Sequence, residues 1–369
     1  NVVHRSPPEG GEADSLAPMP TATPADDAKT FHPCVPVDWL WMPRPLRLCV
    51  GWVTIVLFTM CFAILPVSML ASVVIIVRLG LLGSLSYVLP LWVVLFVLSR
   101  LGTRERPEFR KFAQLWYEIF DFGCNLSPEE TVALGSQAYP HTKQSMIIAM
   151  HPHGIIPIHS WLWAAYCDQH MPKVYGFGAV ASVVMHMPII RTLTVWLTCV
   201  PASYKHLKRG LEGDCPPANN AGRKPGNLYI LAGGIAEVFT STPGKDIIVY
   251  RGRKGLCRLS IEQQAKIIPV YVFGGTGFFH NLLTGENIVS QMFRKMKLAV
   301  TMFWGQYLLP IPLPAKVKMA IGEPLEIPEG VSGEEAVEKL HARYLEAMAR
   351  LFEESKVAAG YPDAKLEIR

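Results

Sequence analysis

The pattern of apolar and polar positions divides the 369-residue chain into three segments. Residues 1–43 are rich in Pro, Ala, Asp and Glu and hold few large apolar groups, so they can bury too little surface to offset the entropy of ordering. We expect a disordered tail there. Residues 44–100 are almost continuously apolar, with two long uncharged runs separated by Arg78. Residues 101–369 have the mixed pattern of a globular domain.

The apolar segment predicts a helical hairpin embedded in a membrane. A helix needs about 20 residues to cross the hydrocarbon core, so the first uncharged run is too long for one straight span. Pro66 lies where a bend would fit, and Arg78 lies near the expected turn. Two full spans and a re-entrant wedge both agree with this pattern, and a pair of buried core helices is the alternative. Basic residues flank both ends, which predicts that both face the cytosol: Arg44, Arg47, Arg100, Arg104, Arg106, Arg110 and Lys111.

In the third segment, short apolar runs alternate with helix-like patterns. This alternation predicts βαβ units and an α/β domain, in which helices flank a mainly parallel sheet. The expected helices are Ser182–Cys199, Gly255–Ala265 and a last one that begins at Ser332, where Glu335 would complete a capping box. The expected strands are Ser145–Met150, Val174–Val180, Leu228–Leu231, Ile247–Tyr250, Ile267–Phe273 and Val317–Ile321.

Two histidines follow the first of these strands. His151 and His153 flank Pro152, and Gly154 closes the motif. A neutral imidazole is suited to take the proton of an alcohol as its oxygen attacks, so one histidine could act as base while the other orients it or binds substrate. A metal site is an alternative, although no carboxylate or cysteine follows at the usual spacing. A purely structural pair is a further alternative.

The strand predicted at Leu228–Leu231 also ends in a motif that suits chemistry. Gly233 and Gly234 allow close backbone approach, and Glu237 is the acidic residue of the motif. Glu237 could pair with a catalytic histidine, which would raise the basicity of the imidazole and fix its tautomer. A carboxylate that simply favours the positive end of a helix dipole is an equal alternative.

Basic residues form a third candidate site. Arg251, Arg253 and Lys254 directly precede Gly255 and an expected helix, an arrangement that favours phosphate or pyrophosphate. The net charge of +5 does not demand nucleic acid, and an anionic membrane face or a phosphate-bearing ligand fits equally well. A second basic group is more typical of solvated surface charge: Lys205, His206, Lys208 and Arg209.

Several other chemistries are disfavoured. The eight cysteines include no CxxC pair, which argues against a disulfide framework or a zinc site and favours a reducing, cytosol-facing environment. Cys167, Cys199 and Cys257 lie on apolar or helical stretches and are expected to be buried rather than nucleophilic. The glycines of Phe273–Phe279 do not fit a nicotinamide-cofactor motif, and no G-x-S-x-G motif of serine hydrolases occurs.

Short blocks of the globular segment match one known family in character and order. They run from about Ser145 to the C-terminal helix, about two-thirds of the chain. Each block is weakly specific alone, but the ordered set is highly specific. The chain resembles the type-2 diacylglycerol acyltransferases and their monoacylglycerol and wax-alcohol relatives through His151–Gly154, Pro188–Arg191, Gly233–Glu237, Arg251–Gly255, Ile268–Tyr271 and Gly322–Pro324.

A second resemblance concerns the fold. Lys254–Ser260 and Ile268–Val270 are similar to the glycerophospholipid acyltransferases, which implies their α/β sandwich. Those enzymes carry an H-x4-D dyad, but an isoleucine lies five residues after each histidine here, so the aspartate is absent. This departure keeps Glu237 as a candidate partner of the base.

The first resemblance implies transfer of a fatty acyl group from acyl-coenzyme A to diacylglycerol, which makes triacylglycerol. In plant relatives the first histidine of the motif is commonly glutamate, which implies that His153 is the base and His151 its support. Gly154, Gly233 and Gly234 would supply oxyanion-binding N–H groups. The coenzyme A phosphates would be bound by Arg251, Arg253 and Lys254. Acyl-coenzyme A is a co-substrate, and no metal or separate cofactor is expected.

The resemblance also implies an endoplasmic reticulum membrane protein that associates with lipid droplets, without nucleic acid as a partner; a homo-oligomer is compatible with it. Two departures concern the acceptor: the family's Tyr-Phe-Pro is reduced to Tyr139-Pro140, and Gly275–Gly277 replaces the common Glu-Asn. The alternative acceptors are monoacylglycerol and a long-chain alcohol. An alternative of another class is a non-catalytic membrane wedge that coats lipid droplets.

Overall fold

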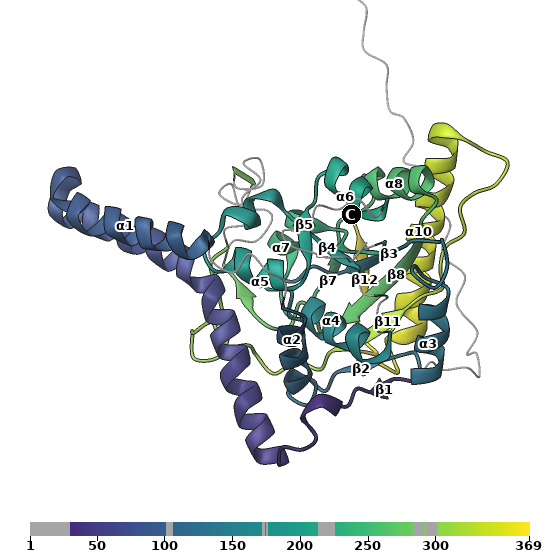
Figure 1. Ribbon diagram of the computed structural model, residues 1–369, viewed down its shortest axis with the longest axis horizontal. Helices are drawn as coiled ribbons and strands as arrows, with labels where there is room; N and C mark the ends of the chain where they lie inside the picture. Colours follow the sequence, from purple (N-terminus) through teal and green to yellow (C-terminus); the bar gives the residue numbers. More distant parts are fainter. Residues whose placement is uncertain are drawn as a thin grey trace, which may run out of the picture.

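Figure 1 shows a central α/β body with one long helical element, α1 (Arg44–Arg100), projecting from one side. The helix α10 (Gly333–Ser355) covers the opposite side of the body. This computed structural model describes residues 30–100, 106–171, 174, 176–212, 226–282, 291–292 and 301–369.

Among the described residues, eight strands form the main sheet. The five strands from β8 to β5 run parallel, whereas β11 is antiparallel to β8 and β1 is antiparallel to β2. The α/β class is therefore confirmed, but the sheet is mixed and not mainly parallel throughout. The apolar runs could not predict this, because they indicate that a strand is buried and not in which direction it runs. The order is β1 (His32–Pro33), β2 (Gly123–Cys124), β11 (Lys318–Ile321), β8 (Lys266–Phe273), β3 (Met146–His151), β6 (Leu228–Leu231), β4 (Phe177–Val180) and β5 (Cys199–Pro201).

Both faces of the sheet are covered, which explains why its central strands are continuously apolar. Ile148 and Met150 of β3 pack on the side of α4 (Ile158–His170) and of η2 (Lys111–Trp116). Ile147 and Ala149 point to the other side, where α8 (Gly255–Gln263) and α10 lie. Successive side chains of β3 therefore belong to two separate hydrophobic cores, one on each face of the sheet.

Three local predictions were wrong. The expected helix Ser182–Cys199 is divided into η3 (Ser182–His186), α5 (Ile190–Trp196) and the start of β5, because Pro188 and the left-handed backbone of Ile189 (φ 62°) interrupt it. The strand expected at Ile247–Tyr250 is β7 (Asp246–Ile248), which pairs with β12 (Leu366–Ile368) outside the main sheet. At Ser332 no capping hydrogen bond forms, because Gly333 begins α10 with φ 61°.

The predicted tail is ordered in its last part, and residues 1–29 lie outside the described residues. Residues 30–43 contain β1 and η1 (Val37–Trp39). The indole Nε1 of Trp39 donates to the carbonyl of Lys111 at 2.8 Å. Backbone pairing of β1 with β2 supplies further partners. Such contacts with distant parts of the chain, invisible in the local composition, order this segment.

The element α1 is long and apolar enough to cross a membrane by length and composition, and only 11% of its most apolar stretch is buried. Its helical geometry is interrupted at Gly80, where φ is 70° and ψ is 171°. The Nε1 of Trp92 donates to the Oγ of Ser72 at 3.0 Å. Twenty residues of straight helix would separate these groups by about 30 Å, so the chain turns back at the interruption.

The first part of α1 is packed on the body. Gly51, Ile55 and Phe58 lie on its buried face at helical spacing. The ring of Phe58 is 5.2 Å from the rings of Trp116 and Trp161, measured between centroids. A Cβ atom on Gly51 would lie 2.7 Å from the backbone oxygen of Leu115, so this glycine sets how closely α1 approaches η2 (Lys111–Trp116).

We predict that Gly51→Ala loosens the contact between α1 and η2. The clash should cost about 1–3 kcal/mol, more than the gain in helix propensity of up to about 1 kcal/mol. Thermal unfolding of the detergent-solubilised protein measures the difference. Gly83→Ala is the matched control, because its Cβ would meet only Leu79 of the same helix. Equal melting temperatures for Gly51→Ala and wild type would contradict the close contact.

Candidate active site

The two predicted motifs meet at one edge of the sheet. Because β3 and β6 are parallel neighbours, with Met150 beside Leu231, the residues that follow both strands come together. His151 ends β3, and Glu237 lies in the first turn of α7 (Gly234–Thr240). The structure thus brings His151, His153 and Glu237 together.

The carboxylate of Glu237 is the centre of this arrangement. Its Oε1 lies 2.6 Å from the Nδ1 of His151 and accepts from the backbone N–H of Val249 at 2.8 Å. Its Oε2 accepts from the backbone N–H of His153 at 2.9 Å. The side chains of Glu237 and His151 are fully buried, and the His151 ring packs edge-on against Tyr250. Glu237 therefore holds the ring of His151 but the backbone of His153.

The glycines of both motifs are required by space or by backbone conformation. A Cβ on Gly233 would overlap the carboxyl carbon of Glu237. Gly154 has φ 69°, and its Cβ would lie 2.7 Å from the backbone oxygen of Gly275. Gly234 also has a positive φ, 51°. These glycines let three loops close around the carboxylate, and their role in binding an oxyanion stays a prediction.

His153 differs from His151 because its ring borders a cavity. The side chain is half-buried, and its Nδ1 lies 2.8 Å from the carbonyl oxygen of Gly154. A carbonyl only accepts, so Nδ1 carries the hydrogen and Nε2 keeps its lone pair. Burial lowers the pKa of His153 below its ordinary value of 6.5, and the Gly154 carbonyl and Glu237 oppose this shift more weakly. At neutral pH the ring is an uncharged acceptor.

The cavity beside His153 has a volume of about 1680 Å³. One wall comes from the middle of α1, through Phe62, Leu65 and Pro66. Another comes from the segment that leads into α8, which contributes basic side chains. A ligand that combines a long apolar chain with an anionic group matches both walls.

The basic side chains only partly match the prediction. Arg253 and Lys254 line the cavity, and Arg258, which was not predicted, lines it one turn further along α8. Spacing of four residues from Lys254 on an expected helix was a signal for Arg258. Arg251 is exposed and does not line the cavity; its Nη2 donates to the carbonyl of Ile368 at 3.3 Å.

Two of these cations are already paired with carboxylates of α10. Arg258 lies 2.7 Å from Glu334, and Lys254 pairs with Glu338. The side chains of Arg258 and of both glutamates are about half exposed. Exposed ion pairs of this kind contribute little to stability, because water and salt screen them. An anionic ligand could therefore exchange with the glutamates at little cost.

His159 was missed by sequence reasoning. It lies in the first turn of α4 and is fully buried next to His153, and its Nδ1 would be 3.5 Å from a Cβ on Gly275. Burial, with the nearby His153 as a smaller cause, lowers the pKa of His159 to about 3. The residue is therefore a neutral imidazole behind the site. A single histidine inside the apolar run Ile155–Leu162 was the available signal.

In the described part of the chain, neither the cysteines nor the residues that could bind a metal form a second catalytic site. Burial raises the pKa of Cys257 to about 11 and that of Cys199 to about 12, so both are thiols at neutral pH. Burial raises the pKa of Cys167 as well. Among the described residues, no group of three His, Cys, Asp or Glu side chains is arranged to hold a metal ion.

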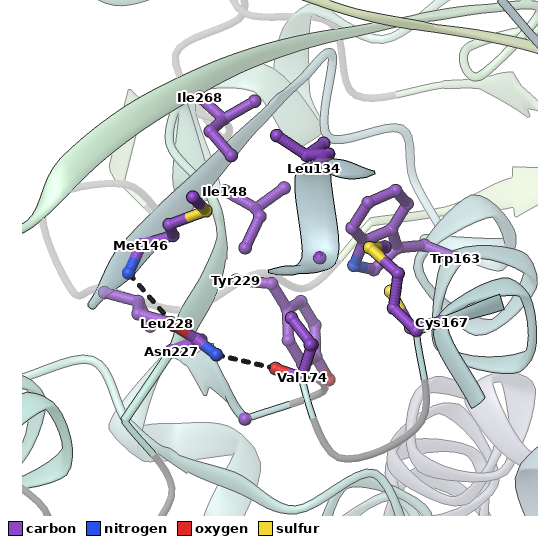
Figure 2. A pocket seen from close by; sticks show the side chains of 13 residues that line it. Leu134, Met146, Ile148, Trp163, Cys167, Val174, Asn227, Leu228, Tyr229 and Ile268 are labelled. Carbon is purple, nitrogen blue, oxygen red and sulfur yellow. Dashed lines mark hydrogen bonds between the residues drawn. The ribbon is translucent and has the colours of Figure 1, made fainter. Parts of the chain in front are cut away.

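A second, much smaller cavity lies at the start of β3 and is shown in Figure 2. Its volume is about 20 Å³, and Ile148, Trp163 and Tyr229 are among the mostly apolar side chains around it. Asn227 joins its walls by accepting from the N–H of Met146 and donating to the carbonyl of Val174. Met146 and His151 are the two ends of β3, so this cavity is separate from the histidines.

Comparison with known proteins identifies the family. A model of the family described as diacylglycerol acyltransferase matches residues 82–369. The chain belongs to the diacylglycerol acyltransferase family. The match covers residues 82–100 of α1 and every site residue from His151 onward, whereas Phe62, Leu65 and Pro66 of the cavity wall precede it.

Curated members of this family are distant relatives of the chain. It is 27% identical over 242 residues to bovine (Bos taurus) diacylglycerol O-acyltransferase 2-like protein 6, with 60% of this chain and 69% of that protein covered. The human (Homo sapiens) diacylglycerol O-acyltransferase 2 is 25% identical, with 61% and 60% covered. The human 2-acylglycerol O-acyltransferase 3 is 26% identical, with 70% and 76% covered.

A solved structure is also similar to this chain. The 1-acyl-sn-glycerophosphate acyltransferase PlsC from Thermotoga maritima aligns with a TM-score of 0.35 and 15% sequence identity. The alignment covers 78% of this chain and 97% of that one. The names of the curated relatives cover more than one acylglycerol acceptor, so family membership alone leaves the acceptor open.

We predict that Glu237→Gln lowers the stability of the protein. A glutamine offers one acceptor oxygen, and its NH₂ group would face an N–H donor in either orientation, which should cost about 1–3 kcal/mol. Thermal unfolding in detergent measures the loss, and Glu323→Gln, at an exposed position, is the matched control. An unchanged melting temperature for Glu237→Gln would show that the carboxylate does not hold the motif together.

Proposed function

We propose that this member of the diacylglycerol acyltransferase family transfers a fatty acyl group from acyl-coenzyme A to the free hydroxyl of diacylglycerol, with His153 as the general base. The observation that carries the proposal is the position of His153. Its neutral ring borders the large cavity, while the buried Glu237 fixes its backbone. The candidate base is therefore held at the wall of the cavity.

In the proposed reaction, Nε2 of His153 takes the hydroxyl proton as the acceptor oxygen attacks the thioester carbonyl. The tetrahedral intermediate collapses by breaking the carbon–sulfur bond, and the coenzyme A sulfur receives the proton from His153. Backbone N–H groups of Gly154, Gly233 and Gly234 would stabilise the oxyanion. His151 would act as support, held by Glu237. This sequence needs no covalent enzyme intermediate, metal or separate cofactor.

The coenzyme A phosphates would bind the basic wall of the cavity. Arg253 and Lys254 keep the role predicted for them, and Arg258 joins them because it lines the same wall. Arg251 is the weakest candidate, because its guanidinium contacts the carbonyl of Ile368 instead. Phosphate oxygens would replace the carboxylates of Glu334 and Glu338.

The membrane would deliver the acceptor. We propose that residues 44–100 form a membrane-embedded hairpin with both ends in the cytosol, followed by a cytosol-facing catalytic domain over 101–369. The turn at Gly80 and the exposed apolar surface of α1 support this topology. Diacylglycerol would reach His153 along the wall that includes Phe62 and Leu65. The expected location is the endoplasmic reticulum with lipid droplets.

Two alternatives remain distinct from this proposal. The same chemistry on monoacylglycerol or a long-chain alcohol is supported by relatives named for those acceptors. A non-catalytic membrane wedge would need the hairpin alone. Against the wedge stands the buried, fully hydrogen-bonded carboxylate behind His153, which a lipid coat does not require.

We predict that His153→Ala abolishes most acyl transfer. Loss of a general base should lower kcat/KM by roughly 10²–10⁴-fold. The assay uses labelled acyl-coenzyme A with diacylglycerol, monoacylglycerol or fatty alcohol, in membranes from a host that makes no neutral lipid. His141→Ala, at an exposed position, is the matched control.

The same assay separates the alternatives. The preferred acceptor is the one with the highest kcat/KM in wild type. Equal transfer by wild type and His153→Ala, at matched expression, would remove His153 as the base. Absence of product from every acceptor, together with lipid-droplet binding that needs residues 44–100, would favour the wedge.

The pH dependence of kcat/KM provides a further prediction. The base must be neutral, and burial lowers the pKa of His153 below 6.5. At pH 6.5 activity should therefore already exceed half of its maximum, and it should fall as the pH drops through this lowered pKa. A pH–rate profile measures the acidic limb, with recovery of activity on return to neutral pH as the control for unfolding. An acidic limb centred above 6.5 would contradict the assignment.

A further inference from the structure

An uncharged loop beside α1 exposes large apolar side chains. The stretch from Thr301 to Ala315 has no charged residue. It includes β10 (Phe303–Trp304) and leads on to β11. At its tip, the side chains of Tyr307, Leu308 and Leu309 are 82%, 79% and 47% exposed. Scattered apolar residues are common on protein surfaces, but consecutive ones at a loop tip indicate a contact.

The backbone holds this tip in an unfavourable conformation. The N–H of Leu309 donates to the carbonyl of Gln306 at 3.0 Å, which closes a four-residue turn. Tyr307 and Leu308 occupy its two central positions with φ of 56° and 60°. Such a turn favours Asn and Gly, because a large side chain is strained at positive φ. Turn stability therefore does not account for Tyr and Leu at these positions.

The loop is fixed against α1. The Oγ1 of Thr59 lies 2.6 Å from the carbonyl oxygen of Pro310, and Thr59 is fully buried. Leu57, two residues before Thr59 on the same helix, is 62% exposed. In Figure 1 the yellow-green loop passes beside the purple first part of α1. The loop tip therefore adds exposed apolar side chains beside a helix that exposes apolar side chains of its own.

We propose that Tyr307, Leu308 and Leu309 insert into the interfacial region of the lipid bilayer beside α1. This inference rests on the membrane position of α1 in the proposed function. A tyrosine with neighbouring leucines suits the boundary between head groups and acyl chains. The lipid bilayer, rather than a second copy, is favoured because the tip adjoins a helix whose own apolar surface is already exposed.

Insertion of the tip would orient the cavity. Thr301 and Phe303, in the same uncharged stretch, line the cavity together with His153. The loop and α1 would then form two membrane contacts around one wall of the cavity. Two separate contacts fix the tilt of the body against the bilayer, whereas the hairpin alone is a single contact about which the body can rotate. The tip is thus a positioning element for access of a lipid acceptor.

Photo-cross-linking in the full-length protein tests the inference. Benzoylphenylalanine replaces Tyr307, and the protein is reconstituted in vesicles of phosphatidylcholine with an alkyne-tagged acyl chain. Leu82 on α1 is the membrane control, and Val357 after α10 is the control for an apolar residue away from α1; they are 84% and 67% exposed. We expect lipid adducts at positions 82 and 307 and only background labelling at 357.

The outcomes separate this inference from the proposed function. Adducts at 82 without adducts at 307 would overturn the loop inference and leave the membrane hairpin in place. No adduct at either position would overturn both. Protein–protein adducts at 307 in place of lipid adducts would identify a second copy as the occupant and would also overturn the inference.

A double substitution provides the matched variant. Tyr307→Asn with Leu308→Gly fits the turn geometry, so the melting temperature should be unchanged or higher. With benzoylphenylalanine at Leu309, the lipid adduct should be lost in the double variant and present in the parent. An adduct that persists would show that the two central side chains do not drive insertion.

Discussion

The site depends on one buried carboxylate. Glu237 accepts hydrogen bonds from the imidazole of His151 and from the backbone N–H groups of His153 and Val249. An ionised carboxylate without such partners would be very costly to bury. The segment of His151 and His153 and the segment of Val249 must therefore converge on its oxygens. The absence of a side chain at Gly233 provides the room.

This arrangement gives the two histidines different properties. His151 is fully buried, and its Nδ1 contacts the carboxylate, whereas His153 contacts the carboxylate only through its backbone. The ring of His153 is held by the carbonyl of Gly154 and borders the cavity. Burial then keeps the pKa of His153 below 6.5. The carboxylate therefore fixes the position of the candidate base without a direct ion pair that would raise the pKa of its imidazole.

The sequence predicted the features that depend on neighbouring residues in the chain. Continuous apolar runs located β3 and β8 to within one residue at each end, and the polar residues after β3 and β6 lie together at one edge of the sheet. Features created by distant contacts could not be predicted. The direction of β11, the order in residues 30–43 and the turn of Arg251 away from the cavity all depend on partners remote in the sequence. His159 was missed because it lies within an apolar run, where it carries no motif of its own.

The two walls of the cavity face different physical environments. On the α1 side, apolar side chains continue into an element whose outer surface is apolar. On the α8 side, Lys254 and Arg258 form ion pairs with glutamates of α10. Half-exposed ion pairs contribute little to stability, so these cations can be satisfied in the folded protein and still be available to phosphate. His153 borders the same cavity. An apolar acceptor could therefore reach it from the α1 side, and an anionic acyl donor from the α8 side.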